Sequence, residues 1–195
     1  MTGWIVYSKQ DFEINKSFAR IFEDAGKQRG ITIYPLLLDD IIFGASSNGP
    51  YFAARNGTPM PDFIISRFRA HELSRHFETC GVPVFNNSEV SYICNNKFLT
   101  HQYLARHSVD MMDTVLCAHE LFAPVPADGL PRVVKAVGGH GGSEVFLAST
   151  PEQFEACAAK CPHGAVSQEL CSLPGKDVRV YVLGKDVIVV RGSTR

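Results

Sequence analysis

Short apolar runs alternate with amphipathic stretches along the first half of the chain. Four apolar runs are typical of buried strands: residues 4–7, 31–38, 62–67 and 83–86. Helical spacing of apolar residues predicts helices at residues 15–29 and 70–80. In the first of these helices, one face carries Phe18, Ile21, Phe22 and Ala25. Residues 39–61 are rich in Gly, Ser, Asn and Pro and are expected to be irregular. Repeated strand–helix units predict an α/β domain with a parallel, doubly wound sheet.

The pattern changes near residue 87. Helices are expected at residues 88–94, 97–107 and 151–160, with Ser88 capping the first of them. In the second, we expect a buried face formed by Phe98, Leu99, Tyr103 and Leu104. Strands are expected at residues 111–117, 132–137, 145–148, 165–171, 178–183 and 187–190, with a turn at 124–131. Hairpins mixed with helices indicate an α+β arrangement.

A lysine and a glycine-rich turn form the most informative stretch. Lys135 ends an apolar run, and residues 138–142 read Gly-Gly-His-Gly-Gly before the next apolar run. Glycines let backbone N–H groups approach a polyanion closely, and a lysine adds a compact positive charge. The pattern predicts either a phosphate cradle or a glycine-rich hairpin without a ligand.

Better-known phosphate motifs are excluded. The chain has no G-x-x-x-x-G-K-[ST] segment, and G-x-G-x-x-G fails because Glu144 stands where the third glycine belongs. The glycine turn joins two strands, so a nucleotide would lie under a hairpin flap. No dinucleotide fingerprint follows the first strand, which argues against a dehydrogenase.

Composition narrows the class of protein. The 195 residues are 45% hydrophobic and 20% charged with a net charge of -1, so no basic field for nucleic acid or membrane is present. With no apolar run long enough for a bilayer and no signal-peptide pattern, we expect a cytoplasmic protein. The six cysteines form no C-x-x-C pair, and the zinc pattern begun by His71-Glu72 fails at Arg75. No metal ligands are therefore assigned in this chain.

Four motifs occur in one order: Asn96-Lys97, Val134-Lys135 with residues 138–142, residues 167–170 (Ser-Gln-Glu-Leu) and residues 176–179 (Lys-Asp-Val-Arg). This ordered set resembles the ATP-grasp superfamily, and most of all its RimK-type carboxylate–amine ligases. The resemblance implies a Rossmann-like domain at residues 1–93. It further implies an ATP-grasp small subdomain with a glycine-rich flap at 94–172, and the start of a second ATP-grasp subdomain at 173–195, so that only the first half of the ATP-grasp domain is present.

The resemblance also implies roles for matching residues. Lys97 and Lys135 would contact the α- and β-phosphates of ATP, and the flap with Gly139, Gly141 and Gly142 would close over the triphosphate. The backbone of Glu169 and Leu170 would bind adenine, and Asp177 would lie near the ribose. Arg179 and Arg191 would act catalytically where the acyl phosphate forms.

The implied reaction moves the γ-phosphoryl group of ATP to a carboxylate, after which an amine attacks the acyl phosphate. The substrates are not identified; an amino acid, a peptide or a protein tail all suit the family, and homodimers and tetramers are common in it. The family's Mg²⁺ ligands are expected beyond Arg195. Two interpretations therefore stay open: a fragment of a longer ligase, or a non-catalytic module that binds a nucleotide.

Overall fold

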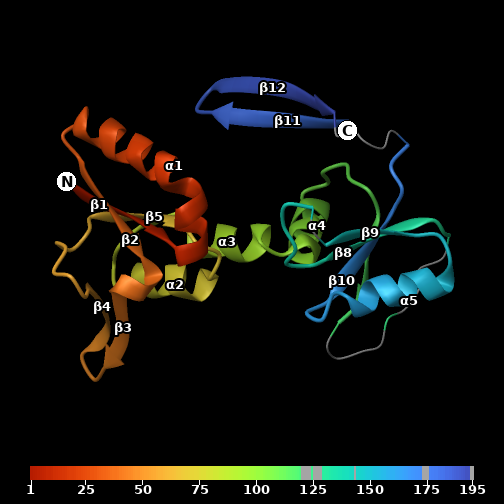
Figure 1. Ribbon diagram of the computed structural model, residues 1–195, viewed down its shortest axis with the longest axis horizontal. Coiled ribbons are helices and arrows are strands. Elements are labelled where there is room, and N and C mark those ends of the chain that lie inside the picture. Colours follow the sequence, from red (N-terminus) through yellow and green to blue (C-terminus); the bar gives the residue numbers. More distant parts are fainter. Residues whose placement is uncertain (120–123, 125–128, 143, 173–175, 194–195) are drawn as a thin grey trace. The chain divides into compact units, whose positions relative to one another are not determined.

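The computed structural model describes residues 1–119, 124, 129–142, 144–172 and 176–193. The chain divides into two compact units, Met1–Asn95 and Asn96–Arg195. Figure 1 shows the helices and strands of both units. The finer division of the second unit at residue 172 stays a prediction.

The first unit is built on a parallel four-stranded sheet in the order β2-β1-β5-β6. Its strands are β1 (Thr2–Tyr7), β2 (Thr32–Leu37), β5 (Phe63–Arg67) and β6 (Val84–Phe85). Its helices are α1 (Lys9–Lys27), α2 (His71–Thr79) and α3 (Ser88–Cys94), with a 3-10 turn, η1, at Leu38–Asp40. The predicted parallel α/β sheet is confirmed.

Alternation along β1 divides its side chains between the two faces of the sheet. Ile5 and Tyr7 pack with Ala19 of α1 on one face, while Trp4 and Val6 pack with Phe77 of α2 on the other. Figure 1 shows α1 and α2 on opposite sides of the sheet. The sheet is therefore doubly wound, as predicted.

The prediction of an irregular segment at residues 39–61 is confirmed for residues 55–61 but wrong for residues 41–54. A hairpin forms there from β3 (Ile41–Ser46) and β4 (Gly49–Ala54), turning through Ser47 and Asn48. Phe52 of β4 is buried, with its ring centroid 4.8 Å from that of Phe77 and 5.5 Å from that of Trp4. Packing against the sheet stabilises strands that the local composition disfavours.

The helix predicted at residues 15–29 begins earlier. Ser8 caps α1 by accepting a hydrogen bond from the Asp11 backbone N–H, which fixes the start at Lys9. Ile21, expected on the buried face, is exposed. The sheet instead contacts the face that carries Ala19 and Phe22. For α3, the capping side chain is that of Asn87 rather than Ser88.

The second unit has an antiparallel four-stranded sheet in the order β7-β10-β8-β9. The strands are β7 (Thr114–Ala118), β8 (Arg132–Ala136), β9 (Val145–Ala148) and β10 (Ala165–Glu169), and a separate hairpin pairs β11 (Lys176–Leu183) with β12 (Asp186–Ser193). The helices are α4 (Lys97–Arg106) and α5 (Pro151–Ala159). The turn predicted at 124–131 lies largely outside the described residues.

The core of this second sheet lies under α5. Phe154 and Ala158 of α5 are buried against Val134, Ala165 and Cys117 of three strands. Helix α4 is less buried than predicted: Phe98, Leu99 and Leu104 are partly covered, but Tyr103 is 46% exposed and instead contacts the His107 ring.

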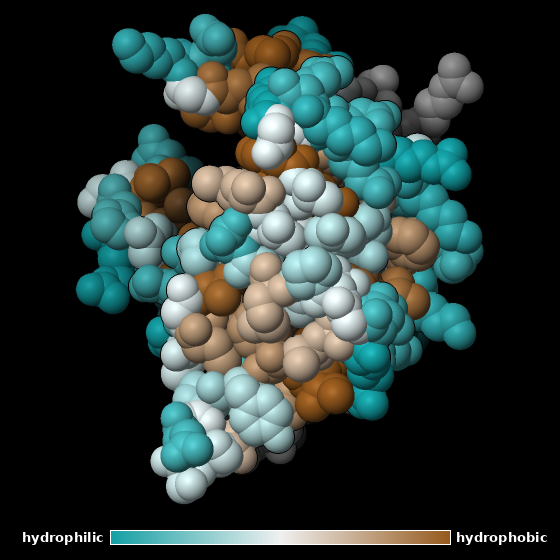
Figure 2. Space-filling model, turned by 90° about the vertical axis from the view of Figure 1, so that its left-hand side faces the viewer, coloured by the Kyte–Doolittle hydropathy of each residue, from teal (hydrophilic) through white to brown (hydrophobic). Residues whose placement is uncertain are grey.

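Large apolar side chains fill the cores of the two four-stranded sheets, whereas nine on the β11–β12 hairpin are exposed: Val178, Val180, Tyr181, Val182, Leu183, Val187, Ile188, Val189 and Val190. On the face that Figure 2 shows, hydrophobic residues appear in separate patches bordered by hydrophilic ones. Among the described residues, no helix combines the length and the apolar character needed to cross a membrane.

Candidate functional site

The start of α4 is joined directly to the end of β8. Asn96 caps the helix, since its side-chain oxygen accepts hydrogen bonds from the backbone N–H groups of Phe98 and Leu99 at 3.0 and 3.1 Å. The Lys97 backbone N–H donates to the Val137 carbonyl at 2.8 Å. These contacts bring Lys97, which lies far from the glycine turn in sequence, to the base of that turn.

The Lys97 ammonium group binds the backbone of the turn. It donates to the carbonyl oxygen of Ala136 at 3.0 Å and to that of Gly139. A lysine ammonium has three donors, so this arrangement leaves one for a further acceptor. Lys97 therefore both holds the glycine turn and presents a positive charge beside it.

The Lys135 side chain is held by a buried glutamine on the neighbouring strand. Its ammonium donates to Oε1 of Gln168 in β10 at 2.5 Å, and Gln168 is only 6% exposed. The Gln168 amide nitrogen in turn donates to the Thr114 hydroxyl at 2.7 Å. With both ends of the amide engaged, Gln168 fixes where the Lys135 charge lies.

His101 connects this arrangement to the other lysine. Its Nδ1 lies 2.6 Å from the Lys97 carbonyl oxygen, which can only accept, so Nδ1 carries the proton. Nε2 of His101 then accepts a hydrogen bond from the Gln168 amide nitrogen at 2.9 Å. We call Gln168, His101 and Thr114 the glutamine network; it links Lys135 to the first turn of α4, where Lys97 lies.

The two lysines create an excess of positive charge. Burial lowers the pKa of Lys135, and burial together with the charge of Lys135 lowers the pKa of Lys97, an effect that Glu144 partly opposes. No carboxylate of the described residues lies within ion-pair distance of Lys135. Two neighbouring ammonium groups with too little opposite charge favour binding of a polyanion, so these residues fit the phosphates of ATP.

The turn between β8 and β9 has a backbone that suits glycine. Gly141 and Gly142 have φ angles of 62° and 77°, in the left-handed region that side chains disfavour. A Cβ atom at Gly139 would meet the Glu144 side chain at 2.8 Å. Ser143, which follows the glycine turn in the sequence, lies outside the described residues.

The remaining predicted residues are placed as follows. Glu169 ends β10 and Leu170 follows it, both exposed. Arg179 and Arg191 are exposed on the β11–β12 hairpin, where Arg179 pairs with Val190 and Arg191 with Val178. Directly paired residues share a face, so the two arginines lie on opposite faces of this hairpin. The side chain of Asp177 lies outside the described residues.

The roles predicted for these five residues stay predictions. Among the residues that the structure describes, no three His, Cys, Asp or Glu side chains gather as metal ligands would. We therefore derive no step of the reaction through Mg²⁺.

The sequence prediction missed the glutamine network. The motif at residues 167–170 contains Gln168 without giving it a role, and none of the sequence motifs includes His101 or Thr114. One signal was available: Ser167 and Gln168 are consecutive polar residues in a strand of the core, where an uncompensated polar group is costly. Their partners come from α4 and β7, which no spacing along the chain reveals.

The fold and its comparison with known proteins place the chain in the ATP-grasp class. The chain belongs to the RimK-like ATP-grasp family, whose model matches residues 94–194. A solved RimK domain protein ATP-grasp from Sphaerobacter thermophilus superposes with a TM-score of 0.67 at 16% identity, over 95% of this chain and 70% of that one.

Curated relatives extend the comparison. N-acetylaspartylglutamate synthase A of Mus musculus is 32% identical over 155 residues, which cover 70% of this chain and 41% of the relative. Alpha-aminoadipate--LysW ligase LysX of Saccharolobus solfataricus is 28% identical over 178 residues, which cover 85% of this chain and 62% of the relative. The chain thus spans about half the length of the curated relatives it matches.

Proposed function

We propose that this protein is an ATP-dependent carboxylate–amine ligase that works through an acyl phosphate. The observation that carries the proposal is the pair of ammonium groups of Lys97 and Lys135 at the glycine turn, with no carboxylate among the described residues paired to Lys135. Membership of the RimK-like ATP-grasp family supports the same activity.

The described residues suit the positioning that phosphoryl transfer requires. Phosphoryl transfer depends mainly on orientation and on stabilising negative charge. Lys135, held by Gln168, and Lys97, held at the turn, supply fixed positive charges. The glycine turn supplies backbone N–H groups that approach phosphate oxygens without a side chain intervening. Glu169 and Leu170 would bind adenine through their backbone, and Arg179 would stabilise charge at the acyl phosphate.

The substrates belong to the proposal as well. The names of two relatives, N-acetylaspartylglutamate synthase A and alpha-aminoadipate--LysW ligase, both contain an acidic amino acid. We propose that this protein also joins a carboxylate to an amine of the amino acid, peptide or protein-tail class. Within the family, Mg²⁺ would neutralise phosphate charge during the reaction.

Calorimetric titration with ATP tests the first part of the proposal. We expect the chain to bind ATP and Lys135→Ala to bind at least about tenfold more weakly, because a charge-assisted hydrogen bond contributes roughly 1.5–3 kcal/mol. Lys160→Ala is a matched control, since Lys160 is exposed at the end of α5. Absence of ATP binding, or equal binding by both variants, would refute the proposal.

Turnover distinguishes a ligase from a module that binds a nucleotide without reacting it. The complete gene product, supplied with ATP, Mg²⁺ and candidate acids and amines, is expected to release ADP and phosphate in equal amounts with an amide product. Bound ATP that is never consumed with any acid–amine pair would favour the non-catalytic module.

A further inference from the structure

The first unit contains a polar pocket that the proposed nucleotide site does not use. Its volume is about 330 Å³, and it lies where β5 and β6 end and where α1 begins after β1. In open parallel sheets, ligands bind in the crevice outside the carboxyl ends of the strands. The pocket therefore lies where this fold places ligand sites.

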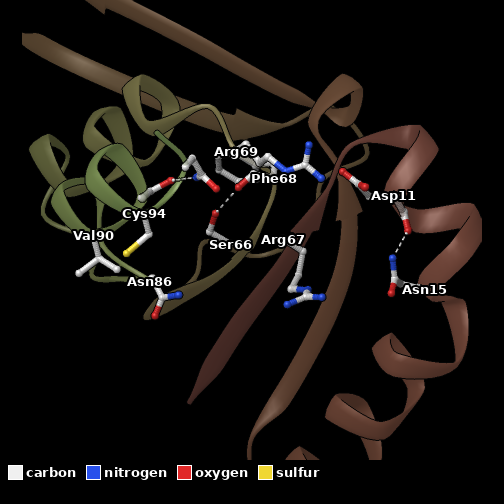
Figure 3. Close-up of a pocket in the computed structure, with 11 residues that line it drawn as sticks. Asp11, Asn15, Ser66, Arg67, Phe68, Arg69, Asn86, Val90 and Cys94 are labelled. Atoms are coloured by element: carbon white, nitrogen blue, oxygen red, sulfur yellow. Dashed lines mark hydrogen bonds between the residues drawn. The ribbon is translucent and has the colours of Figure 1, made fainter. Parts of the chain in front are cut away.

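Three separate segments supply the lining, as Figure 3 shows. Asp11 and Asn15 come from the first turns of α1, and Arg67 and Arg69 come from the end of β5 and the residues after it. Asn86 follows β6 on the opposite side. Two guanidinium groups and one carboxylate give the lining a net positive charge, and the amides add donors and acceptors.

Arg67 is held in place without an acidic partner. It ends β5 next to Tyr7 of β1 in the sheet register, and its guanidinium lies 4.7 Å from the centroid of the Phe18 ring on α1. Within the described part of the chain, no carboxylate lies within ion-pair distance of Arg67. Contact with an aromatic face orients a guanidinium, and its five N–H donors can still engage a planar anion at the edge.

Tyr7 places a buried polar group beside Arg67. Its side chain is fully buried, and its hydroxyl has no hydrogen-bond partner of good geometry among the described residues. Burial raises the pKa of Tyr7, and the neighbouring Arg67 opposes that rise. Tyr7 therefore belongs to the polar surroundings of Arg67, although it does not line the pocket itself.

The carboxylate of the pocket, that of Asp11, already accepts a hydrogen bond within the chain. Oδ2 of Asp11 accepts a hydrogen bond from the Ser8 hydroxyl at 2.7 Å, in the cap of α1. The carboxylate of Asp11 comes from the α1 side of the pocket, and the two guanidinium groups come from the β5 side. This combination suits a ligand with a carboxylate and tolerates an ammonium group on the same molecule.

We propose that this pocket binds a small carboxylate-bearing molecule, with Arg67 binding the carboxylate through its guanidinium edge. Under the proposed function, this molecule is one of the two substrates; that assignment rests on the proposed function, whereas binding itself does not. An arginine presented edge-on binds a carboxylate through two parallel hydrogen bonds, which a lysine does not reproduce.

Calorimetric titration of the chain with glutarate and with L-glutamate tests the proposal. We expect both to bind, glutaramide not to bind, and inorganic phosphate to bind more weakly than glutarate. Arg67→Gln is expected to weaken glutarate binding about 10- to 100-fold, in line with the loss of charge-assisted hydrogen bonds. Arg20→Gln, a matched change at an exposed arginine of α1 outside the pocket, is expected to bind like the unchanged chain.

Three outcomes overturn the proposal: no binding of either diacid, equal binding by Arg67→Gln and Arg20→Gln, or equal binding of glutaramide. If Arg67→Gln unfolds, Arg67→Lys keeps the charge, and its glutarate binding must still fall below that of Arg20→Gln. ATP titration of the same variants separates the two proposals. Loss of glutarate binding with intact, Lys135-dependent ATP binding supports the pocket, whereas glutarate binding without any ATP binding refutes only the proposed ligase.

Discussion

Replacing Gln168 by leucine tests whether the glutamine network positions Lys135. Leucine has a similar volume but cannot accept the hydrogen bond from the Lys135 ammonium at 2.5 Å or donate to Thr114 at 2.7 Å and to His101 at 2.9 Å. The change leaves the half-buried Lys135 ammonium group without its acceptor, and among the described residues no carboxylate lies within ion-pair distance of it as a replacement.

The expected loss of stability follows from those three bonds. Leaving a buried partner of a hydrogen bond unsatisfied costs about 1–3 kcal/mol, and more for a charged group. Thr114 and His101 are only partly buried, so water compensates for part of their loss. We therefore expect Gln168→Leu to lower the free energy of unfolding by about 2–4 kcal/mol and, because Lys135 is no longer held, to weaken ATP binding about tenfold.

Urea unfolding and ATP titration measure the two effects separately. Gln102→Leu is the matched control, because Gln102 is exposed on α4 and its loss removes no bond of the network. Equal ATP affinity for Gln168→Leu and Gln102→Leu would show that Lys135 does not need Gln168. A loss of stability without a loss of ATP affinity would reduce the network to a purely structural role.

Two further predictions concern the glycine turn and pH. Gly141→Ala places a side chain at a φ of 62° and is expected to lower the free energy of unfolding by about 1 kcal/mol, measured by urea unfolding. Gly138→Ala is the control, because Gly138 has neither a left-handed φ nor a close neighbour. Equal stabilities of the two variants would contradict the predicted strain at Gly141. Lowered pKa values mean that Lys97 and Lys135 lose their charge below the ordinary lysine value of 10.5. Bound phosphates would raise these pKa values again, so ATP affinity should fall as pH rises through the alkaline range below 10.5, with proton uptake on binding. Calorimetry in buffers of different ionisation enthalpy measures the proton uptake. Lys135→Arg should reduce this uptake. A constant ATP affinity up to pH 10.5 would contradict the lowered pKa values.

Local patterns in the sequence were sufficient for much of the fold. The parallel sheet of the first unit and the strand–turn–strand unit around Lys135 follow from apolar runs and glycine positions, and both are confirmed. The β3–β4 hairpin was missed because its stability comes from Phe52 packing on Trp4 and Phe77, contacts between residues far apart in the chain. The amino-acid composition of residues 39–61 does not reveal those contacts.

The candidate site was likewise only partly predictable from local patterns in the sequence. Lys97 and Lys135 were identified from an order of motifs, and the structure brings them together through the bond between the Lys97 backbone and Val137. The role of Gln168 depends on the register of β10 against β8 and on the position of α4, which the sequence alone does not specify. The polar pocket was missed for a related reason, since Asp11, Arg67 and Asn86 come from three segments that meet only at the end of the folded sheet.

Both lysines, the glutamine network and the glycine turn belong to the second unit. A change in the orientation of the two units would leave the spacing between the two ammonium groups as it is. The positive charge of the two lysines is thus an internal property of the second unit, set by hydrogen bonds among α4, β8 and β10.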